Sequence, residues 1–87
     1  MSDKVLKFQA KWCGPCQALK MAMAGEDVGV EVEDVDIDSS PELAVKYRVR
    51  GVPTLIYLRD DQEIGRKVGG GSLQEVKTWI DLTKEGV

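Results

Sequence analysis

The hydrophobic residues of this chain recur with two different periods, which predict strands alternating with helices. Residues 4–10 (KVLKFQA) carry several apolar residues and no Gly or Pro, so we expect a strand there. Further along, Cys16, Leu19 and Met23 recur at intervals of three and four in a segment rich in helix-favouring residues. The pattern therefore predicts a strand followed by a helix, with the change near residue 13.

The remaining strands are predicted from three further apolar segments. Residues 30–36 begin with alternating apolar and charged residues, which is typical of a strand near the edge of a sheet. Residues 54–58 (TLIYL) have the apolar and β-favouring density of a central strand. A turn then leads into a second hairpin strand over residues 63–68, which Gly65 is expected to weaken.

Polar start signals predict two further helices. Ser39 or Ser40 can cap the first of them, because Pro41 then falls in its first turn. Ser72 opens the last helix with a capping box, since Glu75 follows three residues later. The buried face of this last helix is expected to comprise Leu73, Val76, Trp79 or Ile80, and Thr83. The full order is strand, helix, strand, helix, strand, strand, helix.

Composition indicates a single domain with protein partners. With 87 residues and 43% hydrophobic content, residues 1–87 are expected to form one small core. Twelve basic and 15 acidic residues give a net charge of −3, which argues against a nucleic-acid or membrane partner. No apolar run reaches transmembrane length, and the first residues (MSDKVLKF) lack signal-peptide features, so we expect a cytoplasmic protein. Acidic residues at positions 31, 33 and 34 discourage edge pairing, which favours a monomer.

The two cysteines of the chain lie together in the sequence WCGPC at residues 12–16. Cys13 is expected at the start of a helix, where unpaired N–H groups and the helix dipole favour the nucleophilic thiolate. Pro15 is tolerated there because the first turn needs no backbone donor. Cys16 lies one turn further in, so we expect it to be more buried and less reactive. This arrangement predicts that Cys13 attacks a disulfide and Cys16 resolves the intermediate.

Other uses of the two cysteines are less consistent with the composition. Structural zinc normally needs four Cys or His ligands, whereas the chain has two Cys and no His. A purely structural disulfide would close too short a loop to remove much unfolded-state entropy. The absence of His also argues against a Cys–His hydrolase. The favoured chemistry is dithiol–disulfide exchange, which requires no metal or organic cofactor.

Three separated segments resemble the thioredoxin family. WCGPC matches the active-site motif of that family, YRVRGVPTLIYL is similar to the segment around its cis-proline, and the glycine pair after Val68 is similar to a third surface loop. The resemblance implies a minimal α/β thioredoxin-like fold, with a four-stranded mixed sheet flanked by three helices. The implied strand order is 30–36, 4–10, 53–58, 63–68, with the first pair parallel and the last pair antiparallel. It also implies that the usual N-terminal strand and helix are lacking, because only residues 1–12 precede Cys13.

The resemblance assigns roles to residues outside the dithiol. It implies a cis Val52–Pro53 bond that faces Cys13 and Cys16, with an ordinary trans proline as the alternative. It also implies a shallow groove that holds an extended protein substrate by main-chain hydrogen bonds. The groove residues are Trp12, Gly14, Pro15, Gly51, Val52, Pro53, Gly69 and Gly70. For Trp12 the alternative is plain packing. The implied partners are protein disulfides and a thioredoxin-reductase-like enzyme.

The chain departs from the family pattern around the dithiol. Lys7 lies where most members bury an aspartate, Gln9 lies where many have a second tryptophan, and Asp34 lies where a lysine is usual. We expect Lys7 and Asp34 to form a reversed, partly buried ion pair near Cys16, because either charge alone would be costly to bury. Asp34 would then accept the proton of Cys16. The alternative is that both are solvated strand charges.

Three rival functions remain at this point. A glutaredoxin-like enzyme would use glutathione, which suits the small size, although Gly14-Pro15 is similar to thioredoxin and differs from the Pro-Tyr between glutaredoxin cysteines. An oxidase or isomerase would need an export signal and a more oxidising couple. A binding module would dock a partner protein through the same groove, with the thiols incidental.

Overall fold

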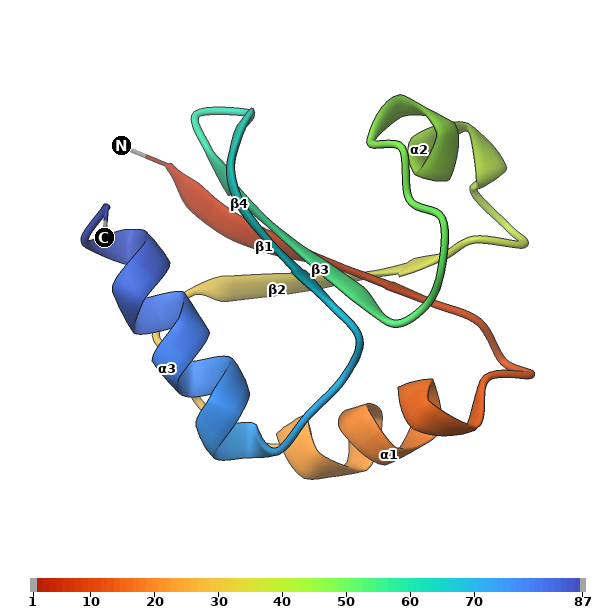
Figure 1. Ribbon diagram of the computed structural model, residues 1–87, viewed down its shortest axis with the longest axis horizontal. Helices are drawn as coiled ribbons and strands as arrows, with labels where there is room; N and C mark the ends of the chain where they lie inside the picture. Colours follow the sequence, from red (N-terminus) through yellow and green to blue (C-terminus); the bar gives the residue numbers. More distant parts are fainter. Residues whose placement is uncertain (1, 87) are drawn as a thin grey trace.

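The computed structural model describes residues 2–86, which form four strands and three helices (Figure 1). In chain order these are β1 (Asp3–Gln9), α1 (Gly14–Met23), β2 (Glu31–Asp36), α2 (Pro41–Lys46), β3 (Thr54–Arg59), β4 (Gln62–Val68) and α3 (Leu73–Lys84). The predicted order of elements is confirmed, and the boundaries of the strands differ from the expected ones by single residues. None of the three helices has the length and apolar character needed to cross a membrane.

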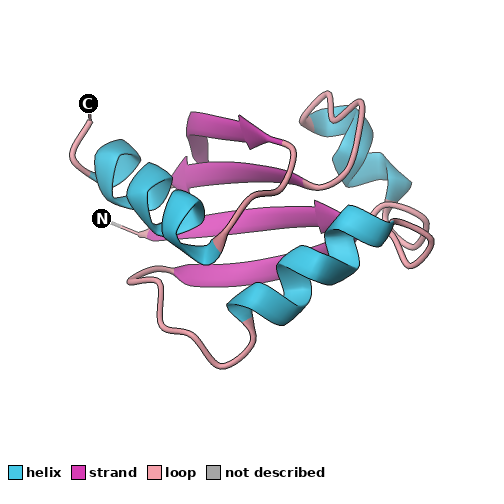
Figure 2. Ribbon diagram, turned by 60° about the horizontal axis from the view of Figure 1, so that its bottom comes forward, coloured by secondary structure: helices cyan, strands magenta, loops and turns pink. Residues whose placement is uncertain are grey.

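The four strands form one mixed sheet in the predicted order, β2-β1-β3-β4. β1 pairs with β2 in parallel, whereas the pairings of β1 with β3 and of β3 with β4 are antiparallel. Helices α1 and α3 cover one face of this sheet and α2 lies over the other, as the two ribbon views show (Figures 1 and 2). β1 lies in the centre of the sheet, and the loop after its C-terminal end leads directly to the start of α1.

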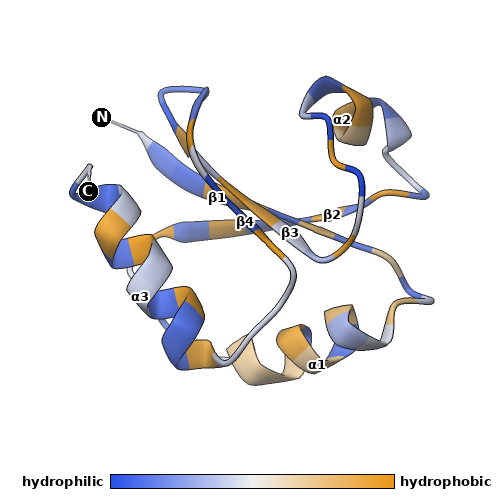
Figure 3. Cartoon of the chain, in the orientation of Figure 1, coloured by the Kyte–Doolittle hydropathy of each residue, from blue (hydrophilic) through white to orange (hydrophobic). Residues whose placement is uncertain are grey.

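The alternation of side chains along the strands builds two cores, one on each face of the sheet. Beneath α1 and α3 lie Val5, Leu19, Val28, Leu55, Tyr57, Val76 and Ile80. Beneath α2 lie Leu6, Phe8, Val35, Ile56 and Leu58. The hydropathy colouring shows apolar residues along the central strands (Figure 3). The apolar density that predicted strand 54–58 thus reflects a strand buried on both faces.

The helix starts follow the sequence signals with one difference. Ser72 accepts a hydrogen bond from the N–H of Glu75 at 3.1 Å, and the Glu75 carboxylate accepts from the N–H of Ser72, so the capping box is confirmed. Ser40 occupies the N-cap position of α2 but makes no side-chain cap hydrogen bond. The prediction that the Ser40 side chain caps this helix is therefore wrong. The fixed φ of Pro41 remains as the local signal for the helix start.

Gly65 has a packing role that the sequence did not indicate. A Cβ at this position would lie 2.6 Å from Cγ2 of Thr83 in α3, so the missing side chain allows the helix to approach β4. The strand continues through the glycine, from Gln62 to Val68. The cost of a glycine in a strand is thus offset by close helix–sheet contact.

The first residue of β1 is fixed by a cluster of hydrogen bonds. Arg59 donates from Nε and Nη2 to the two carboxylate oxygens of Asp3, at 3.0 and 2.9 Å. The Tyr57 hydroxyl donates to Oδ2 of Asp3 at 2.5 Å. These bonds, that of Arg59 first, lower the pKa of Asp3 from 3.8 to about 2.

Acid is expected to weaken this cluster. Because the folded-state pKa of Asp3 lies below its unfolded value of about 4, the carboxylate contributes stability above that pH and loses it as pH falls toward 2. We expect Asp3→Asn to be less stable than the parent at neutral pH and to lose less stability between these two pH values. Urea unfolding across the pH range measures this. An equal acid loss in both proteins would contradict the role of Asp3.

Candidate active site

The loop after β1 places Cys13 at the N-cap of α1. Its backbone is extended, and its Sγ accepts a hydrogen bond from the N–H of Cys16 at 3.2 Å. The two cysteines form a disulfide, with their Cα atoms 5.2 Å apart. Pro15 lies in the first turn, as expected, where its missing N–H leaves no unpaired acceptor. One N–H group of the helix start, that of Cys16, therefore points toward the sulfur of Cys13.

Both sulfurs lie in a small apolar environment. Cys13 is 5% exposed and Cys16 is 3% exposed, and the two pack with Ala10, Ile37 and Val52. The expected contrast in burial has the predicted direction but is small in this disulfide form. The difference between the two cysteines lies instead in their positions. Cys13 is at the N-cap and accepts a helix N–H, whereas Cys16 is within the helix.

A second loop reaches the dithiol from the start of β3. The Val52–Pro53 peptide bond is cis, and the carbonyl oxygen of Val52 lies 3.6 Å from Sγ of Cys13. Val52 is half-buried and Pro53 is buried, whereas the preceding Gly51 is exposed. The loop before β3 therefore places a backbone carbonyl directly beside the sulfur of Cys13.

A third loop, between β4 and α3, completes the surroundings of the dithiol. The N–H of Gly69 donates to the carbonyl of Pro53 at 2.9 Å. A Cβ on Gly70 would lie 3.6 Å from Cγ of Pro53 and 3.9 Å from the carbonyl oxygen of Pro15. The three segments that carry the sequence resemblance thus come together around Cys13.

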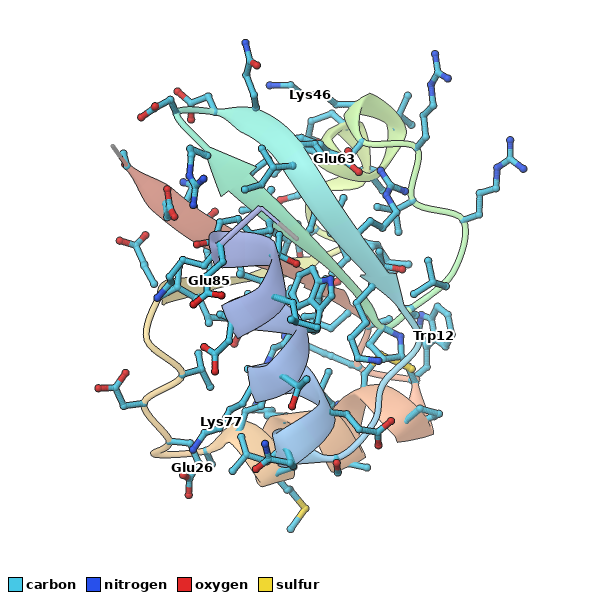
Figure 4. The ribbon with its side chains drawn as sticks, turned by 60° about the vertical axis from the view of Figure 1, so that its left-hand side comes forward. Trp12, Glu26, Lys46, Glu63, Lys77 and Glu85 are labelled. Atoms are coloured by element: carbon cyan, nitrogen blue, oxygen red, sulfur yellow. A yellow bond between two sulfur atoms is a disulfide. The ribbon has the colours of Figure 1, made fainter. Side chains whose placement is uncertain are left out.

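Trp12 projects from the rim of the site (Figure 4). Its side chain is 69% exposed, so the alternative of plain packing is wrong. The indole Nε1 donates a hydrogen bond to Oδ2 of Asp38 at 3.0 Å. Asp38 lies in the turn after β2, and no motif in the sequence marked it as part of the site. The only signal in the sequence is its position just after β2. This strand pairs in parallel with β1, so the two strands end at the same edge of the sheet, near Trp12.

The structure contains the Lys7–Asp34 ion pair, with Nζ of Lys7 at 3.2 Å from Oδ1 of Asp34. The two residues are register partners on the parallel strands β1 and β2. The Lys7 side chain is 6% exposed and that of Asp34 is 50% exposed, so the cation is buried and the carboxylate reaches solvent. Both line a cavity of about 380 Å³ that also contacts Lys20 and Met23 of α1.

The described part of the chain contains no group of three or more Cys, His, Asp or Glu side chains arranged to hold a metal ion. The cysteine pair at the start of α1 is the redox-active element of the site. In a β2-β1-β3-β4 sheet with a cis-proline beside it, such a pair defines a thioredoxin-fold dithiol–disulfide oxidoreductase.

Comparison with known proteins identifies the family. The thioredoxin family model matches residues 1–82. Thioredoxin from Chlamydia trachomatis is 46% identical over 68 residues, which span 75% of this chain and 67% of that protein. A mutant thioredoxin from Halobacterium salinarum has a TM-score of 0.82 and 34% identity, covering 97% of this chain and 74% of that one. Thioredoxin 1 from Thermosipho africanus has a TM-score of 0.76 and 27% identity, covering 94% of each chain. The chain belongs to the thioredoxin family, and its cysteine pair acts in thiol–disulfide exchange.

Proposed function

We propose that this protein acts as a reductant of protein disulfides. The thiolate of Cys13 attacks a target disulfide and forms a mixed disulfide with one target sulfur, releasing the other as a thiolate. Cys16 then attacks Sγ of Cys13, which releases the reduced target and leaves the Cys13–Cys16 disulfide. A thioredoxin-reductase-like enzyme returns this disulfide to the dithiol. The position of Cys13 at a helix N-terminus, beside the carbonyl of the half-buried Val52, is the observation that carries the proposal.

The groove proposed for the substrate uses the loops around the dithiol. Trp12, Gly14, Pro15 and Gly51 are exposed around the two buried cysteines, so the extended substrate chain would contact these residues first. Backbone groups next to the disulfide would bond to the substrate main chain, which makes binding tolerant of sequence. Such tolerance suits an electron donor to several protein disulfides.

We also propose that Lys7 and Asp34 assist the second step. Lys7 lies on the sheet face covered by α1, and Cys16 is one of the two buried residues of that helix. The Lys7 ammonium holds the Asp34 carboxylate at the mouth of the cavity, where solvent also reaches it. Asp34 accepts the proton of Cys16, directly or through water, before Cys16 attacks the mixed disulfide.

The reduction potential of the cysteine pair tests the proposed direction of electron flow. We expect a value at or below the cytosolic glutathione poise, roughly −220 to −320 mV by different methods. Equilibration in dithiothreitol redox buffers, followed by the fluorescence of the adjacent Trp12, measures it. A value near or above about −180 mV would indicate an oxidase, an isomerase or a glutathione-coupled enzyme, and would reject the proposal.

A further inference from the structure

The charges of this chain are segregated along the sequence. Residues 21–45 contain eight of the chain's 15 acidic residues and no basic residue. Residues 43–59 contain four basic residues and no acidic residue. The second segment runs from the middle of α2 to the last residue of β3 and includes the loop that contacts Cys13. The segment that reaches Cys13 is therefore basic, although the net charge of the protein is negative.

Three cations of this segment have no carboxylate partner among the described residues, although Nζ of Lys46 lies 5.3 Å from the centre of the Tyr47 ring. Lys46, Arg48 and Arg50, which we call the basic rim, are all exposed, and none forms an ion pair with a carboxylate among residues 2–86. The nearby Arg66 differs, because it is held by Glu63 at 2.9 Å and donates to the carbonyls of residues 47 and 48. The unneutralised charge thus lies on the basic rim.

Arg48 occupies a backbone position that favours glycine. Its φ is +54°, and it directly follows Tyr47, the C-cap of α2. A residue with a Cβ pays a steric cost in this left-handed conformation, whereas glycine pays almost none. The exposed Arg48 side chain makes no hydrogen bond or ion pair within residues 2–86 that would offset this cost. A strained residue with an exposed charged side chain is a reason to look for function.

The basic rim is close enough to the dithiol to act on a bound polypeptide. Arg50 and Arg48 precede Val52 by two and four residues, so even an extended backbone separates their Cα atoms from it by at most about 7 and 14 Å. The carbonyl of Val52 is itself 3.6 Å from Sγ of Cys13. The Debye length is about 8 Å at physiological ionic strength and about 30 Å at 0.01 M salt. Both arginines therefore affect charges near a target disulfide, most strongly at low salt.

We propose that the basic rim selects protein disulfides that are flanked by acidic residues. This inference rests on the proposed function, since it specifies the substrate class of the same site. Asp or Glu side chains within about four residues of the target cysteine lie within reach of Arg48 and Arg50 when an extended chain crosses Cys13. Complementary charge raises the association rate more than it slows dissociation, so the preference appears in the second-order rate constant.

A set of symmetric peptide disulfides provides the test. Each is a homodimer of a short peptide with a central cysteine, flanked at two and four residues by Glu, Ser or Lys. In the reaction, Cys13 thiolate attacks one peptide sulfur and displaces a peptide thiolate. Cys16 thiolate then displaces the second peptide from Cys13, so one protein dithiol yields one protein disulfide and two peptide thiols. The readout is the ratio of the Glu-peptide rate constant to the Lys-peptide rate constant at low and at physiological salt.

We expect this ratio to be about ten at low salt for the parent protein and to decrease toward one as salt rises. Arg48→Glu should lower the ratio below one. Lys77→Glu on α3, distant from Trp12 in Figure 4, makes the same change in net charge and should leave the ratio unchanged. Because a folding defect slows all three peptides together, the ratio separates charge selection from loss of structure.

Arg48→Gly is the second variant, because it removes the charge and relieves the backbone strain. We expect a higher melting temperature together with a lower ratio. A parent ratio of one, or equal ratios for the parent, Arg48→Glu and Arg48→Gly, would overturn the inference. Failure of the parent to reduce the Ser peptide and the small neutral hydroxyethyl disulfide would instead overturn the proposed function.

Discussion

Cys16→Ser is expected to accumulate mixed disulfides with target proteins, whereas Cys13→Ser is expected to form none. The N–H of residue 16 that donates to Sγ of Cys13 is a backbone group, so the serine variant keeps the activated nucleophile. Without the second thiol, however, the mixed disulfide loses its intramolecular resolving group. A well-placed intramolecular group corresponds to an effective molarity of at least about 10⁵ M, so the intermediate should persist about 1000-fold longer or more. Non-reducing electrophoresis after incubation with oxidised insulin measures the adducts.

The Cys13→Ser variant is the matched control, since it also removes one sulfur from the same turn. We expect its exchange rate to fall by at least about 1000-fold, because the group that forms the covalent intermediate is lost. Equal trapping by the two variants would reject the assigned order of attack. A double variant, Cys13→Ser with Cys16→Ser, that kept full biological activity would favour the binding-module alternative over the redox function.

The topology of this chain was predictable because local patterns and the resemblance agree at every element. The apolar pattern of residues 4–10 differs clearly from the spacing of Cys16, Leu19 and Met23, and the capping box at Ser72 marks the last helix without ambiguity. The strand order required the resemblance, since no local pattern specifies which strands pair. The cis bond before Pro53 likewise came from the resemblance, because most X–Pro bonds in folded proteins are trans.

The features that escaped prediction depend on contacts between distant segments. The hydrogen bond of Trp12 to Asp38 joins residues 26 apart in sequence, and no local pattern signals it. From the sequence alone, Gly65 is expected only to weaken its strand. Its packing role depends on the close approach of Thr83 from α3. Ser40 has the right position for a cap, but its side chain makes no cap bond. Residue types alone therefore predict the chemistry of the site better than they predict the contacts around it.

Asp34→Asn is expected to lower the free energy of unfolding by about 1–3 kcal/mol, because it leaves the buried Lys7 ammonium without its anion. Lys7→Met removes the charge but keeps the volume, and such replacements of buried ions are often neutral or stabilising. Urea unfolding measures both changes. The two variants should therefore differ in stability, even though each breaks the same ion pair.

Glu33→Gln is the matched control, since Glu33 lies in the same strand and also pairs with a lysine at 3.2 Å. The side chain of its partner Lys4 is 34% exposed, compared with 6% for Lys7, so this substitution should have a much smaller effect on unfolding. Similar losses for Asp34→Asn and Glu33→Gln would mean that the burial of Lys7 does not make its stability depend more strongly on its carboxylate partner.

The same variants test the proposed proton transfer. If Asp34 accepts the proton of Cys16, Asp34→Asn should slow the decay of the mixed disulfide and move the rise of its rate to higher pH, while the first attack by Cys13 stays unchanged. A merely structural carboxylate would alter stability without separating these two steps. Stopped-flow measurement of formation and decay across the pH range distinguishes the two roles. Unchanged decay in both Asp34→Asn and Lys7→Met would exclude the pair from the chemistry and leave solvent to accept the proton.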